Sequence, residues 1–311
     1  MRTLLGFTLL LCLAVPAAAG DLFVSNIAGD DRRDARAARL IAAGHGPVRS
    51  IGKALRLAAA GDRIIVENTS EPYRETLSMM GSRHGASSVG PLVIEGRGAV
   101  LDGSVGIPEQ QWENHAGEVF SYRPARLGHQ QLFIAGRPAV RRPARSSDVA
   151  LPAIEPLEWC FMRGKIYFRV ERGRLPADYE LSCCGLQTGI TLYQVEGLLI
   201  RDLIVQGFQL DGVAVHDLVR ETRLERVTSR GNGKSGISVR GASLVELDDC
   251  QLSFNGQSQL RVDDFARCWL YRCELPDDTA PAIQRSGGQV TRVDEPFAVG
   301  GLPRREERRS P

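Results

Sequence analysis

Four polar residues of different chemistry recur at nearly constant spacing in the second half of the chain. Tyr193, His216, Arg240 and Asp263 each close a short segment of alternating apolar and polar residues, and successive members lie 23 or 24 residues apart. A phenol, an imidazole, a guanidinium and a carboxylate placed side by side offer a proton acceptor, a cation and an anion to one substrate. These four residues, here named the outward column, are the predicted catalytic group.

Elimination from an acidic sugar is the chemistry that such a group suits best. A base must remove a weakly acidic carbon-bound proton while a cation or hydrogen bond stabilises the enolate-like charge. His216 or Tyr193 can act as the base, and Arg240 or Arg261 can neutralise the substrate carboxylate. Ser238 lies beside the column and, with Arg261, is a predicted substrate-binding residue. The alternative is a solvated sheet face, whose outward residues are polar in any case.

Other polar clusters give weaker indications. Arg141 belongs to a proline-rich arginine cluster at 137–145 that can bind acidic glycan or simply face solvent. Asp263 and Asp264 are sequence neighbours, so they do not supply the two facing carboxyl groups of a glycosidase. The pairs Asp248–Asp249 and Asp263–Asp264 raise a calcium alternative, but no D-x-D-x-D-G loop accompanies them. We therefore expect no metal site and no cofactor, with calcium as the minor alternative.

An internal repeat positions the outward column. Its rungs start at Gly189, Gly212, Gly236 and Gln259, and each carries two short strands separated by glycine-rich turns. A fixed period of this size indicates a solenoid, in which each rung buries its apolar face by stacking on its neighbours. Strand alternation then points eight apolar residues inward. They are Ile190, Leu192, Val213, Val215, Ile237, Val239, Leu260 and Val262.

Two solenoid types compete for this period. The stretch from Leu247 to Asn255 fits a leucine-rich repeat, but Ser229 replaces a leucine in the preceding rung, and 276–278 replaces the asparagine region of the next. No rung contains a helical stretch. The sequence therefore predicts an all-β fold, a right-handed parallel β-helix solenoid with an N-terminal helical cap and a β insertion.

The N-terminal part carries a family resemblance. Ser50 is a predicted N-cap for a helix whose apolar face includes Ile51 and Leu55, Gly61 ends that helix, and 62–66 reads as the first buried strand. Together with 92–96, 100–103 and the repeats, this stretch resembles secreted pectate-lyase-like right-handed β-helix proteins over residues 22–104 and 189–285. The resemblance implies that the outer sheet face lines a glycan cleft. It says little about the reaction, because one solenoid hosts many activities.

The chain divides into five predicted segments. Residues 1–20 have a positive start, a short apolar core and an Ala-rich cleavage pattern, so we expect a signal peptide and a secreted, periplasmic or cell-surface location. The last residues are charged and lack apolar content, which predicts disorder. The segments are 1–20 signal peptide, 21–108 cap and first coils, 109–185 β insertion, 186–290 regular repeats and 291–311 tail.

Cysteine usage and charge bound the remaining possibilities. Six cysteines follow the predicted signal peptide, too low a density for a fold held together by disulfides. Cys250 and Cys273 are one rung apart, which allows either a disulfide or two reduced core thiols. The 39 basic and 37 acidic side chains give a net charge of +2, so a dedicated nucleic-acid binder is not expected. No later apolar run reaches membrane length. The prediction is an exported protein that binds a polysaccharide, with acidic polysaccharides among the candidates, or cleaves it as a lyase-like enzyme. The alternatives are a non-catalytic glycan-binding module and a structural cell-surface module.

Overall fold

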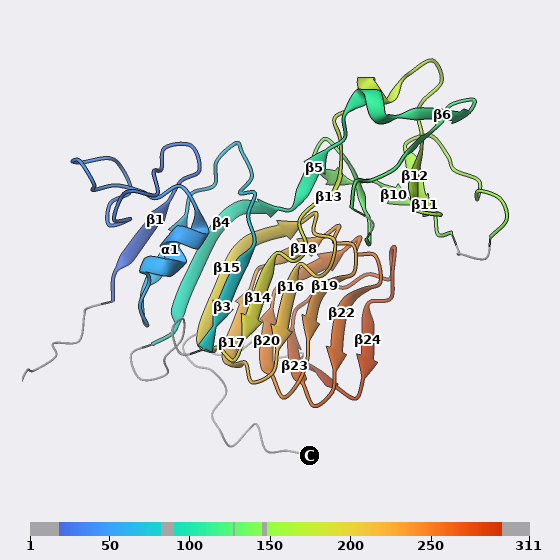
Figure 1. Cartoon of the computed structure of the whole chain (residues 1–311). Coiled ribbons are helices and arrows are strands. Elements are labelled where there is room, and N and C mark those ends of the chain that lie inside the picture. Colours follow the sequence, from blue (N-terminus) through green and yellow to red (C-terminus); the bar gives the residue numbers. More distant parts are fainter. Residues whose placement is uncertain (1–18, 82–89, 127, 145–147, 294–311) are drawn as a thin grey trace, which may run out of the picture.

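The chain is predominantly β and is built around two long parallel sheets (Figure 1). The computed structural model describes residues 19–81, 90–126, 128–144 and 148–293. The ten-stranded sheet contains β1 (Asp21–Val24), β2 (Arg63–Val66), β4 (Leu92–Asp102), β15 (Glu196–Gln206), β17 (Arg220–Glu225), β18 (Thr228–Arg230), β20 (Leu244–Asp248), β21 (Gln251–Ser253), β23 (Arg267–Tyr271) and β25 (Gln289–Val293). The six-stranded sheet contains β3 (Leu77–Met80), β14 (Ile190–Tyr193), β16 (Val213–His216), β19 (Ser235–Val239), β22 (Ser258–Asp263) and β24 (Ile283–Ser286).

The chain passes repeatedly from the six-stranded to the ten-stranded sheet and back, and each pass adds one strand to the six-stranded sheet and one or two to the ten-stranded sheet. Along the six-stranded sheet Ile190 pairs with Val213, Val213 with Ile237, Ile237 with Leu260, and Leu260 with Ile283. Each step therefore advances the chain by 23 or 24 residues, which is the period expected from the sequence.

The core lies between the two sheets and confirms the predicted inward face. All eight residues expected to point inward have 0% exposed surface and belong to one apolar cluster. Cys250 joins the same cluster, and its thiol donates to the carbonyl oxygen of Leu224 at 3.3 Å. Cys250 and Cys273 are both free thiols, which decides the alternative left open by the sequence.

A buried asparagine ladder joins the turns on one side of the coils. The side-chain oxygen of Asn255 accepts hydrogen bonds from the backbone N–H of Asn232 at 2.9 Å and from its side-chain amide at 3.0 Å. The amide of Asn255 in turn donates to the Ser229 carbonyl oxygen at 3.0 Å and to Gln259 at 2.8 Å. These bonds satisfy polar groups that the turns bury, as the interior of a protein requires.

The predicted N-terminal helix is confirmed, and it is shorter than the stretch up to Gly61 that the sequence predicted. Helix α1 (Ile51–Leu57) begins after Ser50, whose hydroxyl accepts from the backbone N–H of Lys53 at 3.1 Å. It ends at Leu57, four residues before Gly61, where φ is +82° and the chain turns into β2. The helix packs Ile51 and Leu55 against the first strands.

The predicted insertion consists of two small antiparallel-rich sheets at the end of the coils drawn at the upper right of Figure 1. One sheet joins β5 (Ser104–Gly106), β13 (Leu181–Cys184), β8 (Leu132–Ile134) and β9 (Arg137–Pro138). The other joins β6 (Glu113–Ala116), β7 (Val119–Tyr122), β12 (Lys165–Arg169), β11 (Glu158–Met162) and β10 (Val140–Arg141). The insertion has its own core, with Trp159 and Phe168 fully buried.

The described residues modify two of the predicted boundaries. The pairing of β5 with β13 starts the insertion at Ser104, slightly before residue 109. Strand β25 continues the ten-stranded sheet to Val293, so ordered structure extends past residue 290. The signal peptide and most of the predicted tail lie outside the described residues, and so does Arg145 of the arginine cluster. No helix in the described part of the chain is long and apolar enough to cross a membrane.

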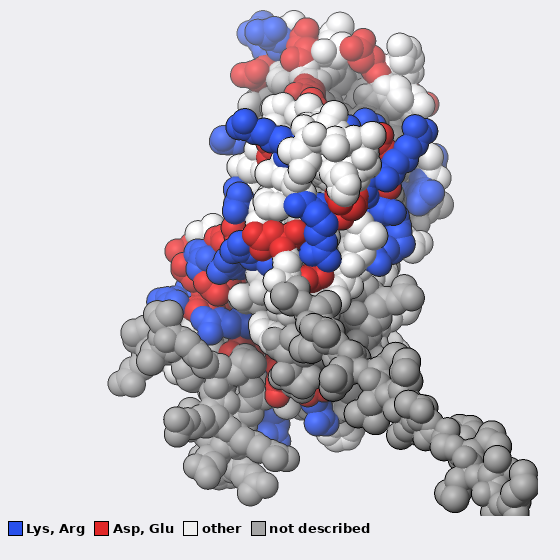
Figure 2. All heavy atoms as spheres, turned by 90° about the vertical axis from the view of Figure 1, so that its left-hand side faces the viewer, with Lys and Arg blue, Asp and Glu red and all other residues white. Residues whose placement is uncertain are grey.

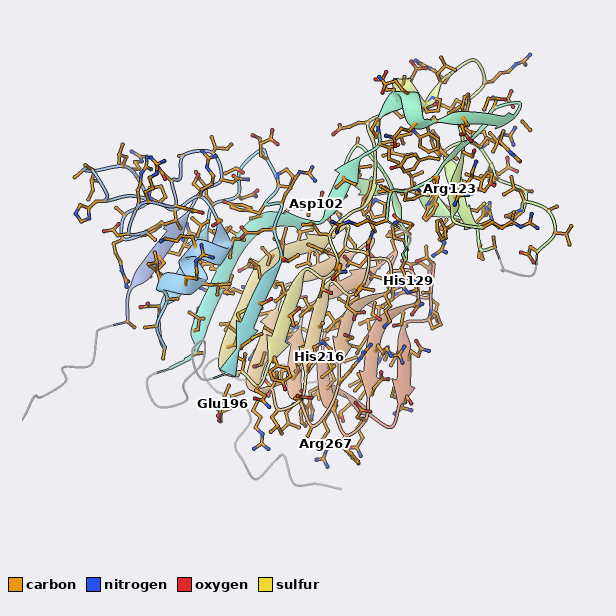
Figure 3. All side chains as sticks on the ribbon, in the orientation of Figure 1. Asp102, Arg123, His129, Glu196, His216 and Arg267 are labelled. Carbon is orange, nitrogen blue, oxygen red and sulfur yellow. The ribbon has the colours of Figure 1, made fainter. Side chains whose placement is uncertain are left out.

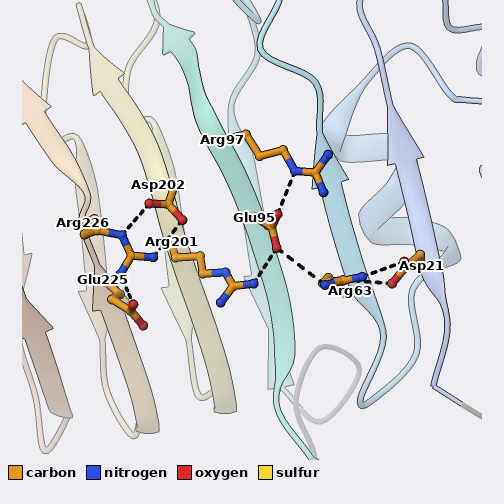
Figure 4. A network of polar contacts seen from close by, with 8 residues as sticks. All are labelled: Asp21, Arg63, Glu95, Arg97, Arg201, Asp202, Glu225 and Arg226. Atoms are coloured by element: carbon orange, nitrogen blue, oxygen red, sulfur yellow. Dashed lines mark hydrogen bonds and ion pairs between the residues drawn. The ribbon is translucent and has the colours of Figure 1, made fainter. Parts of the chain in front are cut away.

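A charge network covers the outer face of the ten-stranded sheet (Figure 4). Glu95 accepts from Arg97 at 2.7 Å and from Arg201 at 2.5 Å, and its second oxygen lies 3.8 Å from Arg63. Arg63 in turn forms two hydrogen bonds to Asp21. Hydrogen bonds from Arg97 and Arg201 hold the pKa of Glu95 at about 2.

Glu95→Gln is expected to lower the free energy of unfolding at pH 7 by about 1–2 kcal/mol. The folded-state pKa of Glu95 is below its unfolded value of 4.5, so its contribution is present above pH 4.5 and is lost as the pH falls toward 2. Urea unfolding at several pH values measures this, with exposed Glu67→Gln as the control. Equal losses for the two variants at pH 7 would contradict the prediction.

Candidate functional site

The outward column forms a single row on the outer face of the six-stranded sheet. Tyr193 pairs directly with His216, and the residues that precede His216, Arg240 and Asp263 are paired in register. Adjacent parallel strands lie about 4.8 Å apart, so the four side chains follow one another at that spacing. The predicted adjacency of these four residues is confirmed.

Exposure divides the column. Tyr193 is 39% exposed, His216 and Arg240 are half-buried, and Asp263 is 7% exposed. Ser238, expected to be open to a ligand, has 0% exposed surface, so that expectation is wrong for the structure as it stands. The reason is a carboxylate from the preceding coil, which covers it.

That carboxylate belongs to Asp211, which the sequence analysis did not select. Asp211 lies in the turn before β16 and accepts from the Ser238 hydroxyl at 3.0 Å and from the Ser235 backbone N–H at 3.1 Å. Asp211 is 6% exposed. Its side chain therefore lies over the first half of β19, next to the outward column. Asp211 directly precedes Gly212, the glycine that opens a rung, and this position was the sequence signal that could have identified it.

Asp263 is held by two arginines. Its Oδ2 atom lies 2.6 Å from Arg261 Nε and 3.6 Å from Arg240 Nε. Its Oδ1 atom and Arg240 Nε are buried and have no hydrogen-bond partner among the described residues. The trio thus carries one net positive charge and two polar atoms that a ligand can satisfy.

His216 is placed to act as a proton acceptor. Burial lowers its pKa, and the charges of Arg240 and Lys234 lower it further, against the opposing effects of Asp211 and Asp217. A His pKa below 6.5 means that the imidazole is mostly neutral at pH 7. Tyr193 is less available as a base, because a hydrogen bond to Asp217 raises its pKa and keeps the phenol protonated.

The insertion places a second histidine, His129, at the turns that precede the strands, whereas His216 lies toward the other ends of the strands (Figure 3). The His129 carbonyl oxygen lies over Gly233, where a Cβ atom would come within 2.6 Å, and its Nδ1 atom is 3.4 Å from the Gln257 amide. Burial lowers the pKa of His129, followed by the charges of Lys234 and Arg141, whereas Asp211 raises it. Lys234 and Asp211 thus act electrostatically on both His129 and His216.

The contacts of His129 join the insertion to the turns that precede the strands. Lys234 lies in one of these glycine-rich turns. Lys234 directly precedes β19, and Asp211 lies two residues before β16, one coil earlier. These similar positions were a sequence signal for both residues. No sequence signal places His129, because its contact with Gly233 joins the insertion to a coil more than a hundred residues later.

Arg141 lies away from open solvent. Its guanidinium is 5.4 Å from the centre of the Trp159 ring, and burial lowers the pKa of Arg141. Its Nε atom is buried without a hydrogen-bond partner among the described residues. Arg141 is therefore only partly exposed, and its role as a substrate-binding residue stays a prediction. The exposed Arg142 of the same cluster is engaged by Glu158 at 2.5 Å.

Charges of both signs are interspersed on the side of the molecule shown in Figure 2. In the described ranges, no group of three or more His, Cys, Asp or Glu side chains is arranged to hold a metal ion.

The arrangement can perform acid–base chemistry on an anionic substrate. An imidazole and two guanidiniums, from His216, Arg240 and Arg261, lie along the outer face of the six-stranded sheet. Two buried carboxylates, Asp211 and Asp263, fix the positions of Ser238 and of the arginines.

Comparison with known proteins gives structural neighbours only. No protein-family model and no curated protein matches the chain. The structure titled "The complex structure of XylC with xylose" aligns at 13% identity and a TM-score of 0.47, over 88% of this chain and 63% of that one. A structure titled "Glycoside hydrolase" aligns at 10% identity and a TM-score of 0.38, over 87% and 97%. The GH136 lacto-N-biosidase from Eubacterium ramulus aligns at 10% identity and a TM-score of 0.39, over 88% and 52%.

Proposed function

We propose that this chain is an exported right-handed parallel β-helix protein that binds acidic polysaccharide along the outward column and cleaves it by β-elimination. The observation that carries the proposal is the position of His216, whose pKa is lowered by burial, beside Arg240 and two strands from Arg261. A base and a carboxylate-binding cation at neighbouring positions are the two groups that this reaction requires.

The reaction follows from these positions. Arg240 and Arg261 hold the carboxylate of a uronate residue, and His216 takes the proton from the carbon next to that carboxylate. The electron pair of the broken C–H bond forms a carbon–carbon double bond, and the adjacent bond to the glycosidic oxygen breaks. The leaving oxygen takes a proton from water. The arginines stabilise the negative charge that develops on the carboxylate during proton removal.

A panel of polysaccharides tests the proposal. The purified protein is incubated with polyuronates and with neutral polysaccharides, and ultraviolet absorbance detects the unsaturated uronate product. Retention in gels that contain each polymer is measured separately. Product from a polyuronate supports the lyase proposal. Retention without product identifies a non-catalytic glycan-binding module. If no polymer gives either product or retention, both interpretations are overturned in favour of a structural component.

Asp263→Asn is expected to strengthen retention by a polyuronate about 5- to 10-fold at low salt, and less at high salt. The substitution keeps the side-chain shape and removes the carboxylate that occupies Arg240 and Arg261. Asp264→Asn is the matched control, because it removes the same charge from an exposed neighbour. An equal change in both variants would mean that only net charge matters.

A further inference from the structure

A small pocket lies where the insertion meets the coils, beside the turn that precedes β16. Its volume is about 220 Å³, and its lining includes Val105, Tyr122, Pro124, Ala125, Leu186 and Gln209. Most of these side chains are apolar. The pocket therefore favours a small apolar group and has little room for a whole oligosaccharide.

Gln209 connects this pocket to the proposed site. It is 6% exposed, and its backbone N–H donates to the Leu186 carbonyl oxygen at 2.8 Å. Two residues later the same turn presents Asp211, whose carboxylate lies beside the outward column. Gln209 precedes β16, and the column residue His216 ends it, so the pocket and the outward column lie toward opposite ends of this four-residue strand.

The side-chain amide of Gln209 has an unused donor. Its Nε2 atom is buried and has no hydrogen-bond partner in the described part of the chain. Gly128 packs over the amide, where a Cβ atom would lie 3.2 Å from Oε1. A buried donor without an acceptor is unfavourable, so an acceptor supplied by a ligand would be a favourable addition.

We propose that this pocket receives an acyl substituent of the polysaccharide, an O-acetyl or N-acetyl group. The methyl group would pack on the apolar lining of Val105, Pro124 and Leu186, and the carbonyl oxygen would accept from the Gln209 amide. The orientation of the polysaccharide relative to the outward column rests on the proposed function. The affinity of the pocket for an acetyl group does not. The proposal narrows the substrate class to an acylated acidic glycan.

Saturation-transfer NMR on the full chain tests the pocket with N-acetylglucosamine as the probe and glucose as the unacylated comparison. We expect saturation of the acetyl methyl protons by the wild-type protein, and at least a fivefold weaker signal for Gln209→Leu. Ala125→Phe, at an exposed position in the pocket lining, fills the pocket and is expected to give the same loss without removing the amide. Gln251→Leu, an equal substitution at an exposed strand position outside the lining, is expected to keep the wild-type signal.

Two results would overturn the pocket proposal. One is a methyl signal no stronger than the glucose signal; the other is a wild-type signal from both Gln209→Leu and Ala125→Phe. Retention of an unacylated polyuronate separates this proposal from the proposed function. The pocket variants are expected to retain the unacylated polyuronate as the wild-type protein does. A wild-type protein that does not retain this polymer would reject the proposed function and leave the pocket proposal standing.

Discussion

His216→Ala is expected to reduce the rate of unsaturated-product formation from a polyuronate by at least about 100-fold, because a positioned base contributes about 10²- to 10⁴-fold. The side chain is half-buried at the end of β16 and outside the apolar core, so the free energy of unfolding should change by about 1 kcal/mol or less. Product formation under saturating polymer is the measurement, and urea unfolding checks the fold. His115→Ala, on the exposed side of the insertion, is the matched control.

The pH profile gives this prediction a second readout. Burial and the charge of Arg240 lower the pKa of His216, and only its neutral form accepts a proton. The rate should therefore rise with pH and reach half its plateau below pH 6.5. Arg240→Lys keeps the charge and should retain more activity than Arg240→Ala. Wild-type rates from both His216→Ala and Arg240→Ala would show that the outward column is a solvated face.

The stacked strands were predictable because their signal is local and repeated. Alternation within each strand settles which side chains face inward, and the 23- or 24-residue period settles which residues become neighbours. Val215, Val239 and Val262 are paired as this reasoning requires, and all three are fully buried. The same period put His216 beside Arg240.

The surroundings of those positions were not predictable in the same way. Ser238 points away from the core as alternation requires, yet it is buried because Asp211 reaches over it from the turn of the preceding coil. Arg141 stacks on Trp159 through the pairing of β10 with β11, which periodicity in the coils does not address. His129 reaches Gly233 and Gln257 only because the insertion folds back onto the turns. These contacts depend on tertiary packing, which strand spacing does not encode.

Val239→Asp is expected to be the most destabilising single change, since it places a carboxylate between stacked coils. Val239 has 0% exposed surface and lies between Val215 and Val262. No cation or hydrogen-bond donor replaces water for the new charge there, so the free energy of unfolding should fall by about 3–5 kcal/mol, or the chain should fail to fold. Urea unfolding measures the loss.

Two further variants keep the Val239 prediction testable if Val239→Asp yields no folded protein. Val239→Ala removes two methyl groups without adding charge and is expected to cost about 2 kcal/mol. Ala242→Asp adds the same carboxylate three residues later at an exposed position and should change stability by about 0.5 kcal/mol or less. Because residues 239 and 242 differ in burial and share one coil, similar losses at both would contradict the inward register. A large loss confined to Val239 would show that stability depends on dry contact between successive coils.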